Sequence, residues 1–244
     1  MLTIKLINNK KICITIFFLI FIILNFTFIV EYSRAESNFI NNKNIDLIYH
    51  IPVKTDIDPS LASFVKKGIE EAETAGADLI LIEISSFGGL VDSAIAIKDN
   101  IITTKIPIIT YVSERAWSAG ALIALAGDEL VMKDGSSMGA AETRPKEEKY
   151  ISALRKEFSA TAELRNRNPE LAEAMVDKDI EIEGIIAKNK LLTLTASEAL
   201  TNNMSNSTVI NLDDLVAKYN LENARIIKLK RSMKEIFADL VTTP

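Results

Sequence analysis

Apolar runs of strand length alternate with segments of helical periodicity, and this alternation constrains the fold more than any other feature of the sequence. The run over 79–84 is apolar on both faces apart from Glu83, as expected for a buried parallel strand. Asp58-Pro59 is a helix start, with an N-cap followed by proline at the first helical position. We therefore predict an α/β fold, with a largely parallel sheet and helices on both faces. The predicted elements are strands over 45–53, 79–84 and 106–112, with helices over 58–75 and 90–103 between them.

The second half of the chain is predicted to be a smaller hairpin and helical part of the same domain. Thr195-Ala196-Ser197-Glu198 is a capping box, which indicates the start of a short helix. Residues 181–186 and 191–194 are predicted to pair as a hairpin. The other predicted elements are a strand over 129–132, helices from about 149 to 166, from 169 to 177 and from 212, a strand over 224–229, and an amphipathic helix over 233–241.

The N-terminus has the pattern of a secretory signal. Ile12–Val30 carries no charged residue, follows three lysines and precedes the small-x-small site Ser33-Arg34-Ala35. We favour cleavage after Ala35, although the apolar run is also long enough to remain as a membrane anchor. Either alternative places residues 36–244 outside the cytoplasm, because the lysines hold the N-terminus inside. Residues 36–44 then form a polar spacer, and 45–241 form one domain.

Composition excludes several classes of function for this domain. Removing residues 1–35 takes away four of the 28 basic and one of the 33 acidic residues, which leaves a net charge of about −8 and argues against nucleic acid as a partner. Cys13, the only cysteine, lies in the leader, so the domain has no disulfide and no cysteine nucleophile. With His50 as the only histidine, the usual zinc sites are also excluded. We expect neither a metal nor a cofactor.

Ser118 is the candidate nucleophile. It lies where an apolar strand ends and an Ala/Leu-rich helix begins, in the region 88–139 that holds six of the nine glycines. The alternative is that Ser118 is only the N-cap of this helix. The amide of Ala119 at the helix N-terminus and the amides of Gly88 and Gly89 can together form an oxyanion hole.

A serine nucleophile requires a base, and the residues leave three candidates. His50 lies in an early strand, where a solvent-side or edge histidine is the more common role. Lys146 and Lys149 lie in or beside the charged link that precedes a helix, and a desolvated lysine can act as a base. Spacing alone does not choose between the two lysines.

The chain resembles the ClpP-like protease domain of the NfeD family of membrane-bound serine proteases, related in fold to the ClpP and crotonase group. The resemblance implies a Ser-Lys dyad endopeptidase in which Ser118 is the nucleophile, Lys149 is the base, and Gly88, Gly89 and Ala119 are the oxyanion donors. It also implies a stomatin-like membrane protein as substrate and a homodimeric state. The motifs that carry it are residues 57–59, 87–92, 116–121, 138–142, 167–169 and 194–200.

Two departures from the family pattern leave other functions open. Phe87 stands where the family usually has proline, and the chain ends where family members commonly continue into membrane spans. We therefore keep two alternatives to an exported serine endopeptidase. One is a non-catalytic scaffold that binds membrane proteins, and the other is a crotonase-like acyl-CoA enzyme, for which an acidic exported domain is poorly suited.

Overall fold

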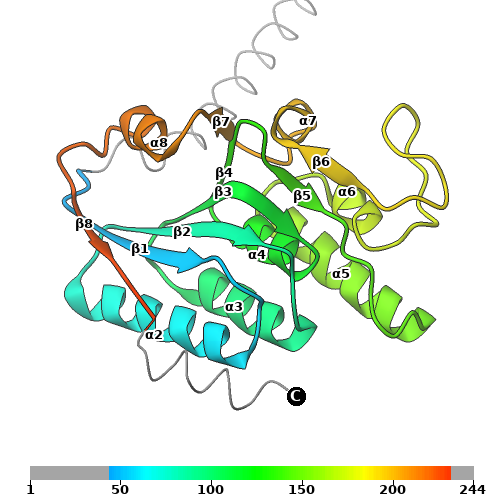
Figure 1. The fold of residues 1–244 in the computed structure, drawn as a ribbon, viewed down its shortest axis with the longest axis horizontal. Helices are drawn as coiled ribbons and strands as arrows, with labels where there is room; N and C mark the ends of the chain where they lie inside the picture. The colour runs from blue at the N-terminus through cyan, green and yellow to red at the C-terminus, as the bar shows by residue number, and fades with distance from the viewer. Residues whose placement is uncertain (1–43, 232–244) are drawn as a thin grey trace, which may run out of the picture. The chain divides into compact units, whose positions relative to one another are not determined.

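The computed structural model describes residues 44–231, which contain an eight-stranded sheet and seven helices. Figure 1 shows the strands and helices alternating along the first half of the chain, so the predicted α/β fold is confirmed. The elements are β1 (Leu47–Val53), α2 (Pro59–Ala75), β2 (Leu79–Ser86), α3 (Val91–Thr103), β3 (Ile108–Trp117), α4 (Ala119–Ala126), β4 (Glu129–Lys133), β5 (Ser137–Gly139), α5 (Glu148–Leu164), α6 (Pro169–Ala174), β6 (Thr193–Thr195), α7 (Ala196–Thr201), β7 (Ser207–Val209), α8 (Leu212–Lys218) and β8 (Arg225–Lys228).

The sheet is parallel except for one pair of short strands. Its order is β6-β5-β3-β2-β1-β8, and β4 pairs with both β3 and β7. Only β5 and β6 run antiparallel among these described strands. In the register of β2 and β3, Ser86 pairs with Ala116. The carboxyl ends of these two strands are therefore neighbours, which brings the turn after β2 beside the turn after β3.

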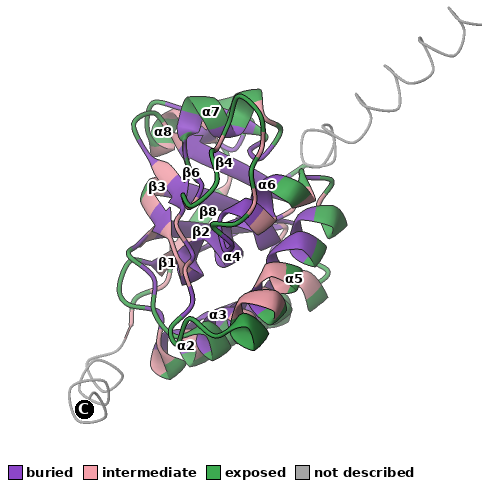
Figure 2. Ribbon diagram, turned by 90° about the vertical axis from the view of Figure 1, so that its right-hand side faces the viewer, coloured by how far each residue is buried: buried purple, intermediate pink, exposed green. Residues whose placement is uncertain are grey.

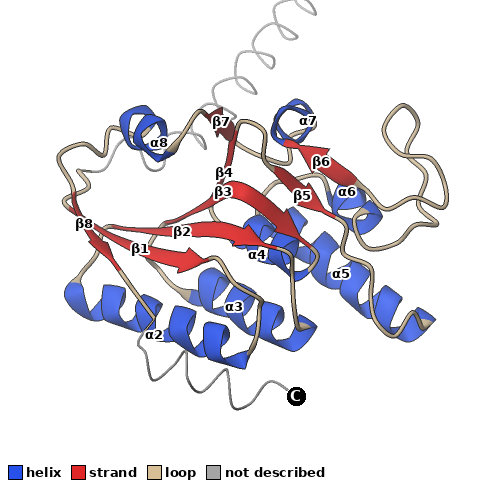
Figure 3. Ribbon diagram, viewed as in Figure 1, coloured by secondary structure: helices blue, strands red, loops and turns tan. Residues whose placement is uncertain are grey.

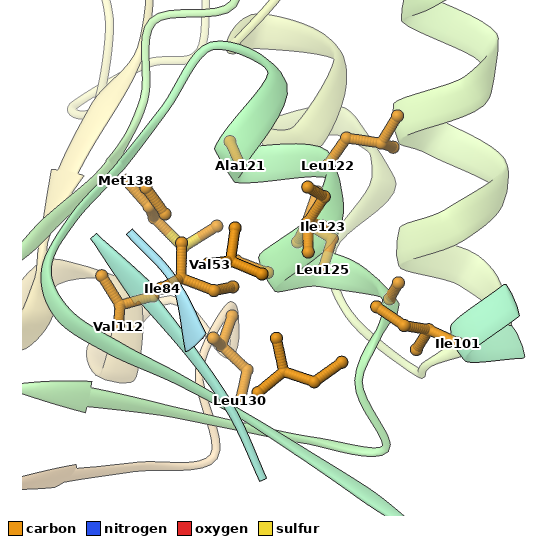
Figure 4. Close-up of a cluster of buried hydrophobic side chains, with 14 of the residues drawn as sticks. Val53, Ile84, Ile101, Val112, Ala121, Leu122, Ile123, Leu125, Leu130 and Met138 are labelled. Carbon is orange, nitrogen blue, oxygen red and sulfur yellow. The ribbon is translucent and has the colours of Figure 1, made fainter. Parts of the chain in front are cut away.

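The helices lie on both sides of the sheet. Figures 1 and 2 show α2, α3 and α5 on one side and α7 and α8 toward the other. The main core forms where α4 packs against the strands, and all eight residues of α4 are buried. Figure 4 shows α4 side chains around the strand residues of this core, among them Ile84 and Val112. A helix that is apolar on every side is stable only when it is enclosed, so α4 is fixed firmly at the centre of the domain.

The predicted helix ends are confirmed where short-range chemistry sets them. The Asp58 carboxylate accepts the N–H of Leu61 at 2.6 Å, and Pro59 is the first residue of α2. Gly76 ends α2 in the left-handed conformation, with φ 67°. The capping box of α7 is complete, with reciprocal bonds between Thr195 and Glu198.

The predictions fail in the second half of the domain. The predicted hairpin of 181–186 and 191–194 is wrong: Ile182 and Ile186 close a small turn on themselves, and β6 pairs instead with β5. The strand β5 was not among the predicted elements, and α6 ends before the predicted residue 177. Figure 3 shows the long loop between α6 and β6 where the hairpin was expected.

Three predictions concern residues beyond this range. The leader over 1–35, most of the polar spacer over 36–44, and the helix over 233–241 lie outside the described residues. Between residues 44 and 231, no helix has the length and apolar character needed to cross a bilayer.

Candidate active site

Ser118 occupies a strained turn between β3 and α4. Its backbone has φ 53° and ψ −123°, a conformation that L-residues adopt only when the surrounding structure imposes it. The N–H of Ser118 donates to the carbonyl of Gly139 at 2.7 Å, which fixes the turn to the end of β5. The Ser118 side chain makes no capping hydrogen bond to α4. Ser118 is thus the N-cap residue of α4 by position, as the alternative expected, but its hydroxyl does not cap the helix and is available for other chemistry.

The glycine pair after β2 lies directly against this serine. Gly88 and Gly89 have φ values of 120° and 153°. A β-carbon at Gly88 would lie 2.6 Å from the Cβ of Ser118, and one at Gly89 would lie 2.2 Å from the carbonyl oxygen of Ile57. The Ile57 N–H donates to Gly88 O at 2.9 Å, and the Leu90 N–H donates to Ile57 O at 2.7 Å. Only glycine fits these two positions, and the pair is held on both sides.

The backbone amides around Ser118 differ in whether they are already bonded. The Gly88 N–H donates to the hydroxyl of Ser86 at 3.1 Å, and this hydroxyl donates to Thr55 O at 2.8 Å. The N–H groups of Gly89 and Ala119 donate to no other described residue. Of the three predicted oxyanion donors, Gly88 already donates its N–H to Ser86. Its lack of a side chain leaves room for Ser118. Gly89 and Ala119 keep the free amides.

Ser86 was not predicted to have a role. It is a buried residue at the end of β2, and its hydroxyl links the glycine turn to the loop after β1. The only sign of this role in the sequence is that Ser86 stands close to a glycine pair. Its partner Thr55 lies 31 residues away, so no local pattern connects the two.

A pocket of about 270 Å³ opens beside Ser118. Its wall is partly apolar and partly polar, and the polar side chains are Ser118 and those of the segment after β5. The Thr143 hydroxyl in this segment is buried and has no hydrogen-bond partner among the described residues. The lining residues are Gly89, Leu90, Val91, Ala94, Ser118, Ala119, Leu122, Glu142, Thr143, Arg144, Leu154 and Phe158. The apolar part of such a pocket is suited to an apolar side chain.

The two candidate lysines do not line this pocket. The Lys149 side chain is 65% exposed, and its Nζ lies 3.2 Å from Glu147 Oε2 and 4.6 Å from the ring centroid of Tyr150. The Lys146 Nζ lies 2.7 Å from Glu142 Oε1, so this lysine is linked to the pocket wall. The structure thus brings Ser118, Gly89 and Ala119 together but leaves the Lys149 amine at the surface. The role of Lys149 stays a prediction.

His50 is not the solvent-side or edge histidine that its alternation suggested. It is 2% exposed, and β1 lies between β2 and β8 rather than at an edge. Its Nε2 lies 2.9 Å from Glu83 Oε2, and the Lys54 Nζ lies 2.6 Å from Glu83 Oε1. Burial by itself raises the pKa of Glu83, but the hydrogen bonds and charges of His50 and Lys54 outweigh burial and lower it to about 2. His50 therefore pairs with Glu83 within the sheet and does not line the Ser118 pocket.

Within the part of the chain that the structure describes, no group of three or more His, Cys, Asp or Glu side chains is arranged to hold a metal ion.

Comparison with known proteins gives relatives among membrane proteins and proteases. The chain is 39% identical over 203 residues to the membrane protein NfeD1b of Bacillus subtilis, covering 81% of this chain and 46% of that protein. It is 27% identical over 222 residues to the membrane-bound protease PH1510 of Pyrococcus horikoshii, covering 82% of this chain and 49% of that protein. The chain thus spans about half the length of the curated relatives it matches, and it is homologous to a membrane-bound protease.

Solved structures agree on the fold. A lysine-to-alanine mutant of the 1510-N membrane-bound stomatin-specific protease, in complex with a substrate peptide, superposes with a TM-score of 0.68 at 24% identity, covering 82% of this chain and 99% of that one. ClpP1 from Listeria monocytogenes gives a TM-score of 0.56 at 23% identity, covering 68% of this chain and 94% of that one. The predicted ClpP-like architecture is therefore confirmed.

The family model described as "NfeD1b, N-terminal domain" matches residues 47–229, which include every element of the sheet and the whole Ser118 site. The predicted NfeD relationship is confirmed, and the chain belongs to the family of NfeD1b N-terminal domains.

Proposed function

We propose that this domain is a serine endopeptidase in which Ser118 is the nucleophile. The observation that carries the proposal is the strained backbone of Ser118, whose hydroxyl makes no capping bond and lies beside a pocket with an apolar wall. Strain of this kind persists only where the structure enforces it, and it concentrates at reactive sites. Homology to a membrane-bound protease supports the same reaction class.

In the proposed reaction the Ser118 Oγ attacks the carbonyl carbon of a peptide bond. A carbon–oxygen bond forms, the Oγ proton passes to the base, and the negative charge moves to the carbonyl oxygen. The amides of Gly89 and Ala119 donate to this oxygen. The carbon–nitrogen bond then breaks as the leaving nitrogen receives the proton, and water hydrolyses the acyl-enzyme.

We propose Lys149 as the base. A lysine amine acts as a base only in its neutral form, which enclosure in an apolar environment favours. The contacts of Lys149 with Glu147 and Tyr150 are both at the surface, where such contacts contribute about 1 kcal/mol or less. Breaking these two contacts therefore costs little. A substrate chain laid across the start of α5 would enclose the amine.

The proposed substrates are apolar segments of membrane proteins. Support comes from the apolar wall of the pocket, to which Leu154 and Phe158 of α5 contribute, and from a relative described as specific for a stomatin homologue. The apolar leader over 12–30 would place the domain at the outer side of a membrane, where such segments emerge. The buried Thr143 hydroxyl in the pocket wall is available to hold the substrate backbone.

A second candidate function has one observation in its favour. Because Lys149 is at the surface in the described structure, a non-catalytic domain that only binds apolar segments would have the same pocket.

Peptide hydrolysis by the full chain separates the two functions. Ser118→Ala and Lys149→Ala are each expected to abolish cleavage of a peptide with an apolar core. Lys146→Ala and Ser197→Ala, which change an exposed lysine and a remote exposed serine, are expected to cleave normally. A folded wild type that binds the peptide without cleaving it would establish the scaffold. If Lys146→Ala lost as much peptide cleavage as Lys149→Ala, the assignment of Lys149 as the base would be contradicted in favour of Lys146.

A further inference from the structure

A group of three side chains lies next to the glycine turn and does not line the pocket. Phe87 precedes Gly88, and Trp117 precedes Ser118. Their rings meet edge to face, with centroids 5.5 Å apart and planes at 78°. The Arg115 guanidinium carbon lies 4.5 Å from the Phe87 ring centroid and 5.7 Å from that of Trp117. We call Phe87, Arg115 and Trp117 the aromatic platform.

The platform is fixed in place although Phe87 is exposed. The Trp117 Nε1–H donates to the Ser137 hydroxyl at 2.8 Å, and Arg115 pairs with Glu114 at 3.2 Å. Trp117 and Arg115 in turn hold the Phe87 ring, yet 63% of Phe87 remains exposed. A ring that is already held loses little rotamer freedom when a ligand stacks on it. The platform is therefore prepared to bind without being covered.

The position of the platform connects it to the nucleophile. Gly88 packs on Ser118, so residues 87 and 117 enter the site side by side. None of the three platform residues lines the pocket, which is formed by α3, α4, α5 and the segment after β5. A peptide with one side chain in the pocket and its carbonyl at Ser118 would therefore place another side chain near the platform.

We propose that the aromatic platform is a second substrate subsite, which binds an aromatic side chain of the substrate against the exposed surface of Phe87. This inference rests on the proposed function, because it assigns the occupant of the platform to the peptide that Ser118 cleaves. An aromatic ring is favoured over an aliphatic one because aromatic pairs gain energy beyond the area that they bury.

Trp117 is the only tryptophan of the chain, which makes its fluorescence a direct reporter of the platform. The test uses the full chain carrying Ser118→Ala, which binds without cleaving. Ten-residue peptides of alanine and leucine with terminal lysines carry one phenylalanine or one cyclohexylalanine at successive positions. Cyclohexylalanine has nearly the same apolar area but no aromatic face.

At one position in the peptide, phenylalanine is expected to bind about 2- to 10-fold more tightly than cyclohexylalanine and to shift the Trp117 emission. Adding Phe87→Leu is expected to remove this difference, whereas Phe87→Tyr keeps it. The matched control is Ile210→Ala, which changes another exposed apolar side chain that neither touches the platform nor lines the pocket, and it is expected to keep the difference.

The proposal is overturned if the phenylalanine preference survives in Phe87→Leu, or if peptides bind with no change in Trp117 emission. It is also overturned if the emission shift follows protein concentration without peptide, because a second copy of the chain would then cover the platform. Failure of the proposed function looks different: the wild type would not cleave, while the Ser118→Ala chain would still show the aromatic preference.

Discussion

Gly88 lies so close to Ser118 that no side chain fits between them. A β-carbon at Gly88 would lie 2.6 Å from Ser118 Cβ and 3.1 Å from its Oγ, and the Gly88 backbone has φ 120°. The geometry of the proposed nucleophile therefore depends on a glycine 30 residues earlier in the chain.

Gly88→Ala is expected to reduce peptide hydrolysis at least about 100-fold, because the methyl group displaces Ser118 and distances of about 1 Å decide such reactions. Gly135→Ala is the matched control. Gly135 also has a positive φ, 82°, but its added carbon meets nothing within 4 Å. This variant should lose about 1–3 kcal/mol of unfolding free energy from backbone strain and retain its hydrolytic rate. Equal losses of activity in both variants would contradict the contact.

Ser86→Ala is expected to loosen the glycine turn. It removes the hydroxyl that accepts the Gly88 N–H and donates to Thr55 O, at a cost of about 1–3 kcal/mol in urea unfolding. We also expect a slower reaction at Ser118, since the Gly88 N–H beside Gly89 would lose its acceptor and the turn would be held only by its bonds to Ile57. Ser113→Ala, whose hydroxyl makes only a long 3.4 Å bond, should change neither quantity measurably.

The sequence predicted those parts of the fold that short-range chemistry determines. Asp58 and Thr195 cap their helices as predicted because an N-cap bond spans only three residues. The pairing of β5 with β6 was missed because it joins two three-residue strands more than 50 residues apart, and neither strand has an alternation long enough to detect. Local patterns carry no information about such pairings.

The candidate site divides in the same way. Ser118 and the glycine pair were found because a turn serine and adjacent glycines are visible in the sequence. Thr143 and the Phe87–Trp117 contact depend on which turns meet in space, so no local pattern indicated them. Ser86 had only a weak local signal, its place beside the glycine pair, because its partner Thr55 is distant in the sequence. The motif at residue 167 also has a structural role: the buried Arg167 guanidinium donates to the carbonyls of Leu125 and Met204.

Thr143→Val is expected to affect stability and activity in opposite directions. The Thr143 hydroxyl is buried without a partner among the described residues, so replacing it with a methyl group should raise the unfolding free energy by about 1 kcal/mol. The same change should lower kcat/KM if the hydroxyl holds the substrate backbone. In the matched control Thr161→Val, a buried hydroxyl that donates to Glu157 O at 2.6 Å is lost, so stability should fall and kcat/KM should not change. An unchanged kcat/KM in Thr143→Val would show that this hydroxyl does not hold the substrate backbone.

Acid unfolding should depend on Glu83. Burial raises the pKa of Glu83, but the hydrogen bonds and charges of His50 and Lys54 outweigh burial. The net effect lowers this pKa from 4.5 to about 2. A folded-state pKa below the unfolded value adds stability above pH 4.5, and this stability is lost as the pH falls toward 2. The shift corresponds to about 3 kcal/mol. Chemical unfolding between pH 6 and pH 2.5 should therefore show a smaller loss in Glu83→Gln than in the wild type, while the exposed Glu70→Gln behaves as the wild type.

Covalent labelling by a fluorophosphonate tests the central claim most directly, because the probe reacts only with an activated serine and requires no knowledge of the substrate. The account predicts one adduct per wild-type chain, mapped by mass spectrometry to Ser118, and no adduct in a folded Ser118→Ala chain. A folded wild type that stays unlabelled, or a label that persists in Ser118→Ala, would contradict it.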